Sequence, residues 1–501
     1  MKRNKFNLFH SLGFLILGTI LGKATGFLKH YLIVYLFSIS QFSDAFFIAN
    51  MIPELVVNIF ISGLLAGAFI PIAGEILAKD GEKRFADFVS GAFFIIGIIG
   101  LIISLTLFLV PQFFSTLLAP EYKNEQKIIV ENLLKYFSPG ILFLGWSAIL
   151  SGILQSLEDF RIVSFGLFIF NLIFIICVFA FKDVFGIYAA GVGVSVGAFF
   201  WFLSHYIYSF HNLKITINFK AISEYVNRTL RLSLPSVLII LISNLILILE
   251  KNLASAYPAG TISELNLAFR MTNLFLVISI FPLSTVLLPR LSKYFTNNQF
   301  ERISRMLNTV LTLITIALIL ILVLFLFNMT LITNIVYHFL KIKAQSFQDI
   351  ANYALMYSLA FIGLFYYMFL IRVFYASQKT WEIVKANLLG LTAYLFTYYF
   401  FEKYFQSKIF PIAYAIYAII TVGYLFKYLS SKMFLQINAI FGQKSLHVFN
   451  VFFVSFILVF KLFCSTHNVI SNLIFSLTFL IFYILVLTKF ELLNIKKLRE
   501  I

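Results

Sequence analysis

Apolar runs long enough to cross a lipid bilayer follow one another along almost the whole chain. About 20 consecutive apolar residues make a transmembrane helix, and the 501 residues contain about fourteen such runs. Backbone polar groups in hydrocarbon must be bonded within the segment, so these runs predict an all-α polytopic membrane protein. Their approximate bounds are 8–36, 43–77, 88–110, 128–157, 162–181, 184–209, 230–253, 262–291, 303–327, 350–375, 384–401, 409–429, 448–464 and 469–487.

Composition excludes a soluble domain. Only 12% of the residues are charged and 61% are hydrophobic, whereas soluble domains contain about 25% charged residues. The formal charge of +17 indicates Lys and Arg in cytoplasmic loops that face anionic lipid, and no nucleic-acid partner. The two cysteines, Cys177 and Cys464, lie in apolar runs, which predicts neither a disulfide framework nor a metal site.

The loops predict topology and domain organisation. Basic residues in alternate loops are in about twofold excess on the side of the N-terminus, so both termini are predicted to be cytoplasmic. No cleavage signal follows the basic start, which indicates an uncleaved first helix. We expect a six-helix lobe at 1–210, a cytoplasmic linker at 211–229, a second six-helix lobe at 230–433, and a C-terminal helix pair with a tail at 434–501.

Ionisable residues inside the first apolar run indicate a pathway, because such groups usually face a cavity. Helical spacing places Lys23, Gly26 and His30 on one face, with Lys29 about a third of a turn away. We expect Gly22 and Gly26 to interrupt this helix, although kinking for packing alone is the alternative. Extension of both lysines to the membrane interfaces is the alternative to a cavity role.

The second apolar run carries a polar stripe. Asn50, Glu54 and Asn58 recur every four residues, and Pro53 is a predicted kink. Hydrogen bonding between helices is the alternative role of the stripe. Asp44 opens this helix, where a carboxylate also favours the helix N-terminus without any substrate role.

Charged residues also occur in the runs 230–253 and 262–291. Arg270 and Asn273 lie one turn apart, and a guanidinium can hold phosphate oxygens in a bidentate fork. An ion pair of Arg270 with Glu250 or Glu54 is the alternative. The sequence contains no phosphate-binding glycine loop and no metal-spaced His/Cys cluster, so we predict neither an enzyme nor a metal site.

Three motifs in the first half resemble one family. They are G-x-x-x-G-F-x-K from Gly22, D-A-F-F-x-A-x-x-x-P from Asp44, and G-A-F-x-P-x-x-x-E ending at Glu75. Together with L-A-F-R-M at 267–271, L-L-P-R-L-S-K at 287–293 and F-Y-A-S-Q-K-T at 374–380, they make the chain similar to the MurJ/MviN lipid II flippases. This family belongs to a superfamily that includes polysaccharide flippases and multidrug exporters.

The resemblance implies roles for particular residues. Family arginines that bind the lipid diphosphate correspond to Lys23, Lys29 and Arg270, and the family aspartate corresponds to Asp44. The chain departs from the family pattern at His30, Glu54, Asn58 and Asn273. An acid that belongs to a sodium site in the family corresponds to Glu250.

The resemblance also implies a function. We expect a monomeric flippase in the bacterial cytoplasmic membrane that moves an undecaprenyl-diphosphate-linked sugar, lipid II, by alternating access. No cofactor is expected, and the membrane potential, H⁺ or Na⁺ are candidate energy sources. Transport of another polyprenyl-linked oligosaccharide is the alternative. A multidrug antiporter would need an acidic cavity, and a membrane glycosyltransferase would need a large catalytic loop.

Overall fold

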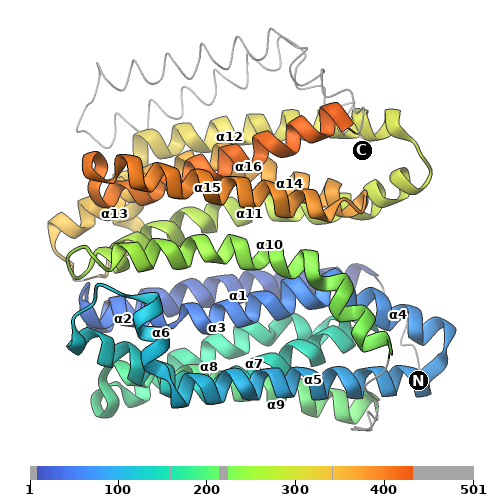
Figure 1. Cartoon of the computed structure of the whole chain (residues 1–501), viewed down its shortest axis with the longest axis horizontal. Helices are drawn as coiled ribbons and strands as arrows, with labels where there is room; N and C mark the ends of the chain where they lie inside the picture. The colour runs from blue at the N-terminus through green and yellow to red at the C-terminus, as the bar shows by residue number, and fades with distance from the viewer. Residues whose placement is uncertain (1–7, 158, 214–223, 341, 433–501) are drawn as a thin grey trace. The chain divides into compact units, whose positions relative to one another are not determined.

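The regular elements of the computed structural model are helices throughout the residues that it describes, which are 8–157, 159–213, 224–340 and 342–432 (Figure 1). Each of the first twelve predicted apolar runs coincides with one helix or with consecutive helices. The last two, 448–464 and 469–487, lie outside the described residues, as does 214–223 of the predicted linker. The prediction of an all-α polytopic membrane fold is confirmed.

The chain divides into two compact units. The first contains Met1–Leu267 with Leu340–Ile342, and the second contains Ala268–Phe339 and the chain from Lys343 onward. In the first unit α10 (Glu224–Ala254) packs against η1 (Ile59–Phe69). The predicted lobes place their boundary earlier, at 211–229, and their role as moving bodies stays a prediction.

Long helices that run side by side form the first unit (Figure 1). The largest contacts join α7 to α9, α8 to α9, α1 to α8, and α5 to α7. The elements of this unit are α1 (Leu8–Phe37), α2 (Gln41–Ala49), α3 (Met51–Asn58), η1, α4 (Ile70–Lys79), α5 (Gly81–Leu109), α6 (Pro111–Leu118), α7 (Asn124–Ser156), α8 (Arg161–Phe185), η2 (Gly186–Tyr188), α9 (Ala189–Leu213), α10 and the start of α11 (Thr261–Thr296).

A serine hydroxyl is inserted into the backbone ladder of α7. Pro139 lies inside this helix and prevents regular hydrogen bonding there. Ser195 of α9 accepts a hydrogen bond from the Gly140 N–H at 3.1 Å and donates one to the Tyr136 carbonyl at 2.5 Å. The side chain therefore satisfies both backbone groups that the proline separates, as an apolar environment requires.

The second predicted transmembrane segment is not one regular helix. It consists of α2, α3, the π-helical η1 and α4. Pro53 lacks an N–H and its ring crowds the carbonyl of Ala49, the last residue of α2. The predicted kink at Pro53 therefore appears as a break at Asn50.

The second unit contains the rest of α11 with α12 (Phe300–Tyr337), α13 (Ala344–Leu359), α14 (Phe361–Ala376), α15 (Thr380–Phe405), η3 (Gln406–Lys408) and α16 (Ile409–Lys432). A polar network joins three of them. The buried Asn387 of α15 accepts hydrogen bonds from Tyr417 of α16 at 2.5 Å and from Tyr367 of α14 at 3.1 Å. This network fixes the register of the three helices.

Seven helical stretches of the described chain are long and apolar enough to cross a membrane, or eight if α13 and α14, which meet at 48°, form one span. Two of the seven, Arg161–Ser209 and Thr380–Ser431, each contain two successive long helices. The protein is thus a multi-pass membrane protein, while the total of about fourteen spans stays a prediction.

A polar cluster closes the turn between α7 and α8. Arg161 donates to both carboxylate oxygens of Asp159, at 3.0 and 2.6 Å, and the Tyr208 hydroxyl donates at 2.7 Å. Burial raises the pKa of Asp159, but these hydrogen bonds outweigh it and hold that pKa below its ordinary value. The ionised form of Asp159 therefore stabilises the folded protein.

We expect this cluster to make stability depend on pH. Because the pKa of Asp159 is lower in the folded state, its contribution is complete above the unfolded pKa of about 3.9. It is lost as pH falls through the folded value. The thermal unfolding midpoint of the purified protein should therefore fall less steeply between about pH 5 and 3 in Asp159→Asn than in the wild type. Parallel profiles for the two proteins would contradict this assignment.

Two glycines of the second unit provide a matched test of packing. A Cβ at Gly363 of α14 would lie 2.3 Å from the backbone of Ala418 in α16, whereas a Cβ at Gly423 of α16 would meet nothing within 4 Å. Gly363→Ala should lower the free energy of unfolding by about 1–3 kcal/mol because backbone must move. Gly423→Ala should be neutral or stabilising, since alanine favours helix. Thermal midpoints of the two variants measure the difference, and equal midpoints would contradict the close contact.

Candidate functional site

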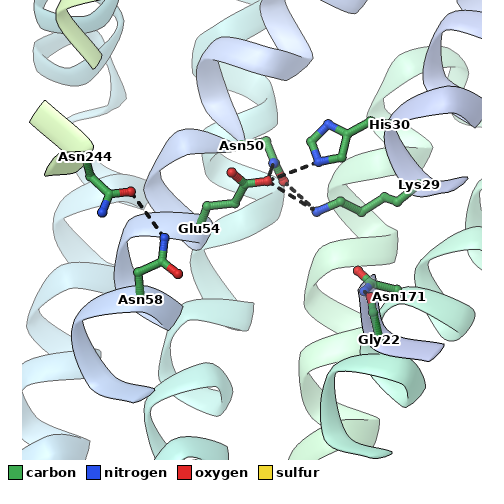
Figure 2. A network of polar contacts seen from close by, with 8 residues as sticks. All are labelled: Gly22, Lys29, His30, Asn50, Glu54, Asn58, Asn171 and Asn244. Carbon is green, nitrogen blue, oxygen red and sulfur yellow. Dashed lines mark hydrogen bonds and ion pairs between the residues drawn. The ribbon is translucent and has the colours of Figure 1, made fainter. Parts of the chain in front are cut away.

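A cluster of polar side chains joins α1 to α3 inside the first unit (Figure 2). Successive residues of α1, Lys29 and His30, both point toward Asn50 and Glu54. Asn50 stands at the break between α2 and α3, and Glu54 lies one turn further. The helix break thus places an amide and a carboxylate opposite two basic side chains.

The Lys29 ammonium is held within the bundle. Its Nζ donates to Asn50 Oδ1 at 3.3 Å and lies 3.9 Å from Glu54 Oε1. The same Nζ lies 5.5 Å from the ring centroids of Phe170 and Phe174 of α8, within the range of a cation–π interaction. The side chain is 5% exposed, so the Lys29 ammonium is buried among these helices.

His30 completes the cluster. Its Nε2 lies 3.1 Å from Glu54 Oε1, and the ring stacks on Phe47 and meets the edge of Phe46. Asn50 Nδ2 donates to the same Glu54 oxygen at 2.8 Å. One carboxylate oxygen is therefore within reach of three groups, Lys29, His30 and Asn50.

The third member of the predicted polar stripe has a different partner. Asn58 Nδ2 donates to Asn244 Oδ1 of α10 at 3.2 Å (Figure 2). This contact is the interhelical hydrogen bond that was the alternative role of the stripe. Substrate contact by Asn58 stays a prediction.

Asp44 lies apart from this cluster and caps another helix. It is 1% exposed. Its carboxylate accepts hydrogen bonds from the N–H groups of Gly260, at 2.6 Å, and Ser263, at 2.7 Å, and from the Ser263 hydroxyl. These donors belong to the N-terminus of α11, where a carboxylate compensates free N–H groups and the helix dipole. Ser40 is the side-chain cap of α2, and Asp44 lies in the first turn of α2, so its carboxylate favours that N-terminus as well as the N-terminus of α11.

The remaining predicted site residues occupy varied environments. Lys23 is exposed on α1, and Glu250, near the end of α10, is only 3% exposed. Arg270 and Asn273 are partly buried residues of α11 in the second unit. Their participation in one binding site with Lys29 stays a prediction, as does an ion site at Glu250.

The two glycines of α1 serve close packing. The helix continues from Leu8 to Phe37, so the expected interruption at Gly22 and Gly26 is not seen. A Cβ at Gly22 would lie 3.3 Å from the Leu167 Cβ of α8, and the Gly22 carbonyl accepts a hydrogen bond from Asn171 at 3.2 Å (Figure 2). The glycines let α8 approach α1, and their role in gating stays a prediction.

Sequence reasoning missed several residues of the site. Phe170 and Phe174 were read only as part of an apolar run, and a single sequence gives no signal that pairs them with Lys29. Asn171 and Asn244 were detectable as lone amides in apolar runs. Such amides need a partner in hydrocarbon. Ser263 follows Gly260 and Thr261, which is a recognisable helix start.

Solved structures of membrane transporters have the same fold. One, described as "Lipid II flippase MurJ, inward closed conformation", shares 21% identity over 96% of this chain and 99% of that chain, with a TM-score of 0.76. An inward-facing MATE-family multidrug resistance transporter of the MOP superfamily shares 13% identity over 82% of this chain and 94% of that chain, with a TM-score of 0.68. The fold is thus that of these multi-helix membrane proteins.

Sequence comparison identifies the family. The family model described as "Lipid II flippase MurJ" matches residues 33–486. A Buchnera aphidicola protein named "Probable lipid II flippase MurJ" is 27% identical over 91% of this chain and 90% of its own length. The "Lipid II flippase MurJ" of Burkholderia cenocepacia is 26% identical over 76% of this chain and 75% of its own length. The chain belongs to the MurJ family of lipid II flippases.

The cap at α11 generates a stability prediction. Asp44→Asn places an amide N–H₂ against backbone N–H donors and removes the charge, so the free energy of unfolding should fall by about 1–2 kcal/mol. Ser263→Ala keeps the backbone N–H contacts and should cost less. The comparison requires thermal midpoints of the purified variants. If Asp44→Asn is as stable as the wild type but binds polyprenyl diphosphate more weakly, the side chain serves the substrate and not α11.

Proposed function

We propose that this protein moves lipid II, an undecaprenyl-diphosphate-linked sugar, from the inner to the outer leaflet of the bacterial cytoplasmic membrane. Membership of the MurJ family supports the substrate class. The observation that carries the proposal for the site is the buried ammonium of Lys29, which lies 3.3 Å from Asn50 Oδ1 and 3.9 Å from Glu54 Oε1. The same Glu54 oxygen lies 3.1 Å from His30 Nε2. A compact ammonium of this kind is a suitable point charge for a phosphate oxygen.

Alternating access accounts for such a transporter. In the proposed cycle the diphosphate binds at Lys29, with Lys23, Arg270 and Asn273 as further predicted ligands. The contact of Asp44 with the N-terminus of α11 supports a role in closing the predicted outer side, because its carboxylate accepts three hydrogen bonds there that can break together. Gly22, Gly26 and Pro53 are the proposed points of bending.

The remaining features of the proposal concern topology and energy. We infer that both termini are cytoplasmic and that a monomer suffices for transport. A membrane potential would act on a cationic site with about 2.3 kcal/mol per unit charge and 100 mV. Coupling to H⁺ or Na⁺ is the alternative source, with Glu250 as the candidate ion ligand.

Complementation tests the proposed function. The chain would be expressed in a bacterium depleted of its own lipid II flippase, and survival and lipid II externalisation would be measured. We expect rescue by the wild type and loss of rescue with Lys29→Ala, because the buried site loses its cation. Lys29→Arg should retain partial function, since it keeps the charge. The double variant Lys23→Ala/Arg270→Ala tests the other predicted ligands.

One control and two contrary outcomes make the result decisive. Each variant must be present in the membrane at the wild-type level, which immunoblotting of membrane fractions measures. Failure of a well-inserted wild-type protein to externalise lipid II would contradict the proposed substrate. Full activity of Lys29→Ala would contradict the proposed site while leaving the substrate in place.

A further inference from the structure

We propose that Glu54 is an internal counter-ion: its carboxylate occupies the phosphate position beside Lys29 in the empty transporter and gives up that position when a diphosphate binds. This inference rests on the proposed function, because it assigns the substrate's diphosphate to the same cluster. A site that binds an anionic substrate is not expected to contain an acidic residue. The counter-ion role gives such a residue, Glu54, a function at this site.

The geometry of the cluster supports exchange of one anion for another. Glu54 Oε1 accepts from Asn50 Nδ2 at 2.8 Å and lies 3.1 Å from His30 Nε2 and 3.9 Å from Lys29 Nζ. An anionic phosphate oxygen is a strong acceptor of the same kind and suits the same set of donors. The donors that hold the carboxylate are therefore suited to hold a phosphate.

The Glu54 carboxylate is more exposed to solvent than the Lys29 ammonium beside it. The side chains of Lys29 and His30 are 5% and 3% exposed, whereas that of Glu54 is 30% exposed. Lys29 is backed by the rings of Phe170 and Phe174 on the side of α8. An anion that reaches the ammonium must consequently displace the more accessible carboxylate.

Electrostatics require the exchange. A buried ammonium without a counter-charge is strongly unfavourable, and Glu54 supplies that charge when no substrate is present. A diphosphate bound at Lys29 beside an ionised Glu54 would place like charges together, which is unfavourable. The carboxylate and the substrate therefore compete for one site.

The local backbone is suited to moving this side chain. Glu54 lies on α3, a helix of eight residues. A break at Asn50 precedes α3 and the π-helical η1 follows it. Irregular helical segments of this kind are frequent at functional sites and at points of conformational change. A short helix between two such segments can reorient without unwinding a long one.

Charge compensation in both states has a kinetic consequence. The substrate neutralises Lys29 in the loaded transporter, and Glu54 neutralises it in the empty one. Removal of the carboxylate should strengthen substrate binding and also leave an uncompensated charge during the return of the empty transporter. Affinity and turnover are then expected to change in opposite directions.

The experiment measures binding and transport by the full-length protein in lipid. Undecaprenyl diphosphate is the probe for binding in nanodiscs, and lipid II transport is measured in proteoliposomes. Glu54→Gln should bind the probe about tenfold more tightly or better, while the maximal transport rate and the half-saturating concentration both fall. Glu54→Asp keeps the charge, and its affinity for the probe should lie between those of the wild type and Glu54→Gln. This variant replaces Glu54→Gln in the test if the amide variant does not fold.

Glu75→Gln is the matched control. Glu75 lies on α4, outside this cluster, and its carboxylate contacts Lys79 at 3.0 Å. The same change of carboxylate to amide there should leave affinity for the probe unchanged. A tighter complex in both variants would show a nonspecific charge effect and overturn the counter-ion role.

Failure of this inference and failure of the proposed function give different results. If Lys29→Ala weakens binding of the probe but Glu54→Gln and Glu54→Asp leave it unchanged or weaken it, the site stands and the counter-ion role is wrong. If the wild type and every variant fail to bind the probe, both proposals are overturned.

Discussion

An ammonium group buried among apolar helices needs a compensating charge, and Lys29 imposes this requirement on the first unit. Its partners lie on two sides: the carboxylate of Glu54 and the amide of Asn50 on one, and the faces of two phenylalanine rings of α8 on the other. Packing of α1 against both α3 and α8 is thereby tied to one charge. The stability of the bundle and the chemistry of the site depend on the same contact.

The break in the second transmembrane segment follows from Pro53. Asn50 and Glu54 stay on one face and are hydrogen-bonded to each other at 2.8 Å, while Asn50 also ends α2 and contacts Lys29. The beginning of the same segment is fixed elsewhere, because Asp44 caps α11. One segment thus combines an anchored start with an irregular middle, which is a suitable arrangement for a moving part of a transporter.

Much of the fold was predictable from the sequence because hydrocarbon imposes a simple rule on backbone groups. The apolar runs located twelve helical segments of the described residues, and Pro53 located the break. Pairings between distant segments were not predictable in the same way. Asp44 and Ser263 are separated by 219 positions. Helical spacing shows which residues share one face of a helix, but not which other helix packs against that face. The charged residues Lys29 and Glu54 were recognised individually, but their contact depends on the tertiary arrangement of α1 and α3.

The serine that bridges the interrupted ladder of α7 has a mechanical consequence. Ser195 holds two backbone groups of α7 from a neighbouring helix, and neither group would find water in hydrocarbon if α9 moved away. The two helices are thus fastened to each other at the point where a proline would otherwise provide a hinge. We therefore expect α7 and α9 to move together as one rigid body, and bending within the first unit to take place in other segments.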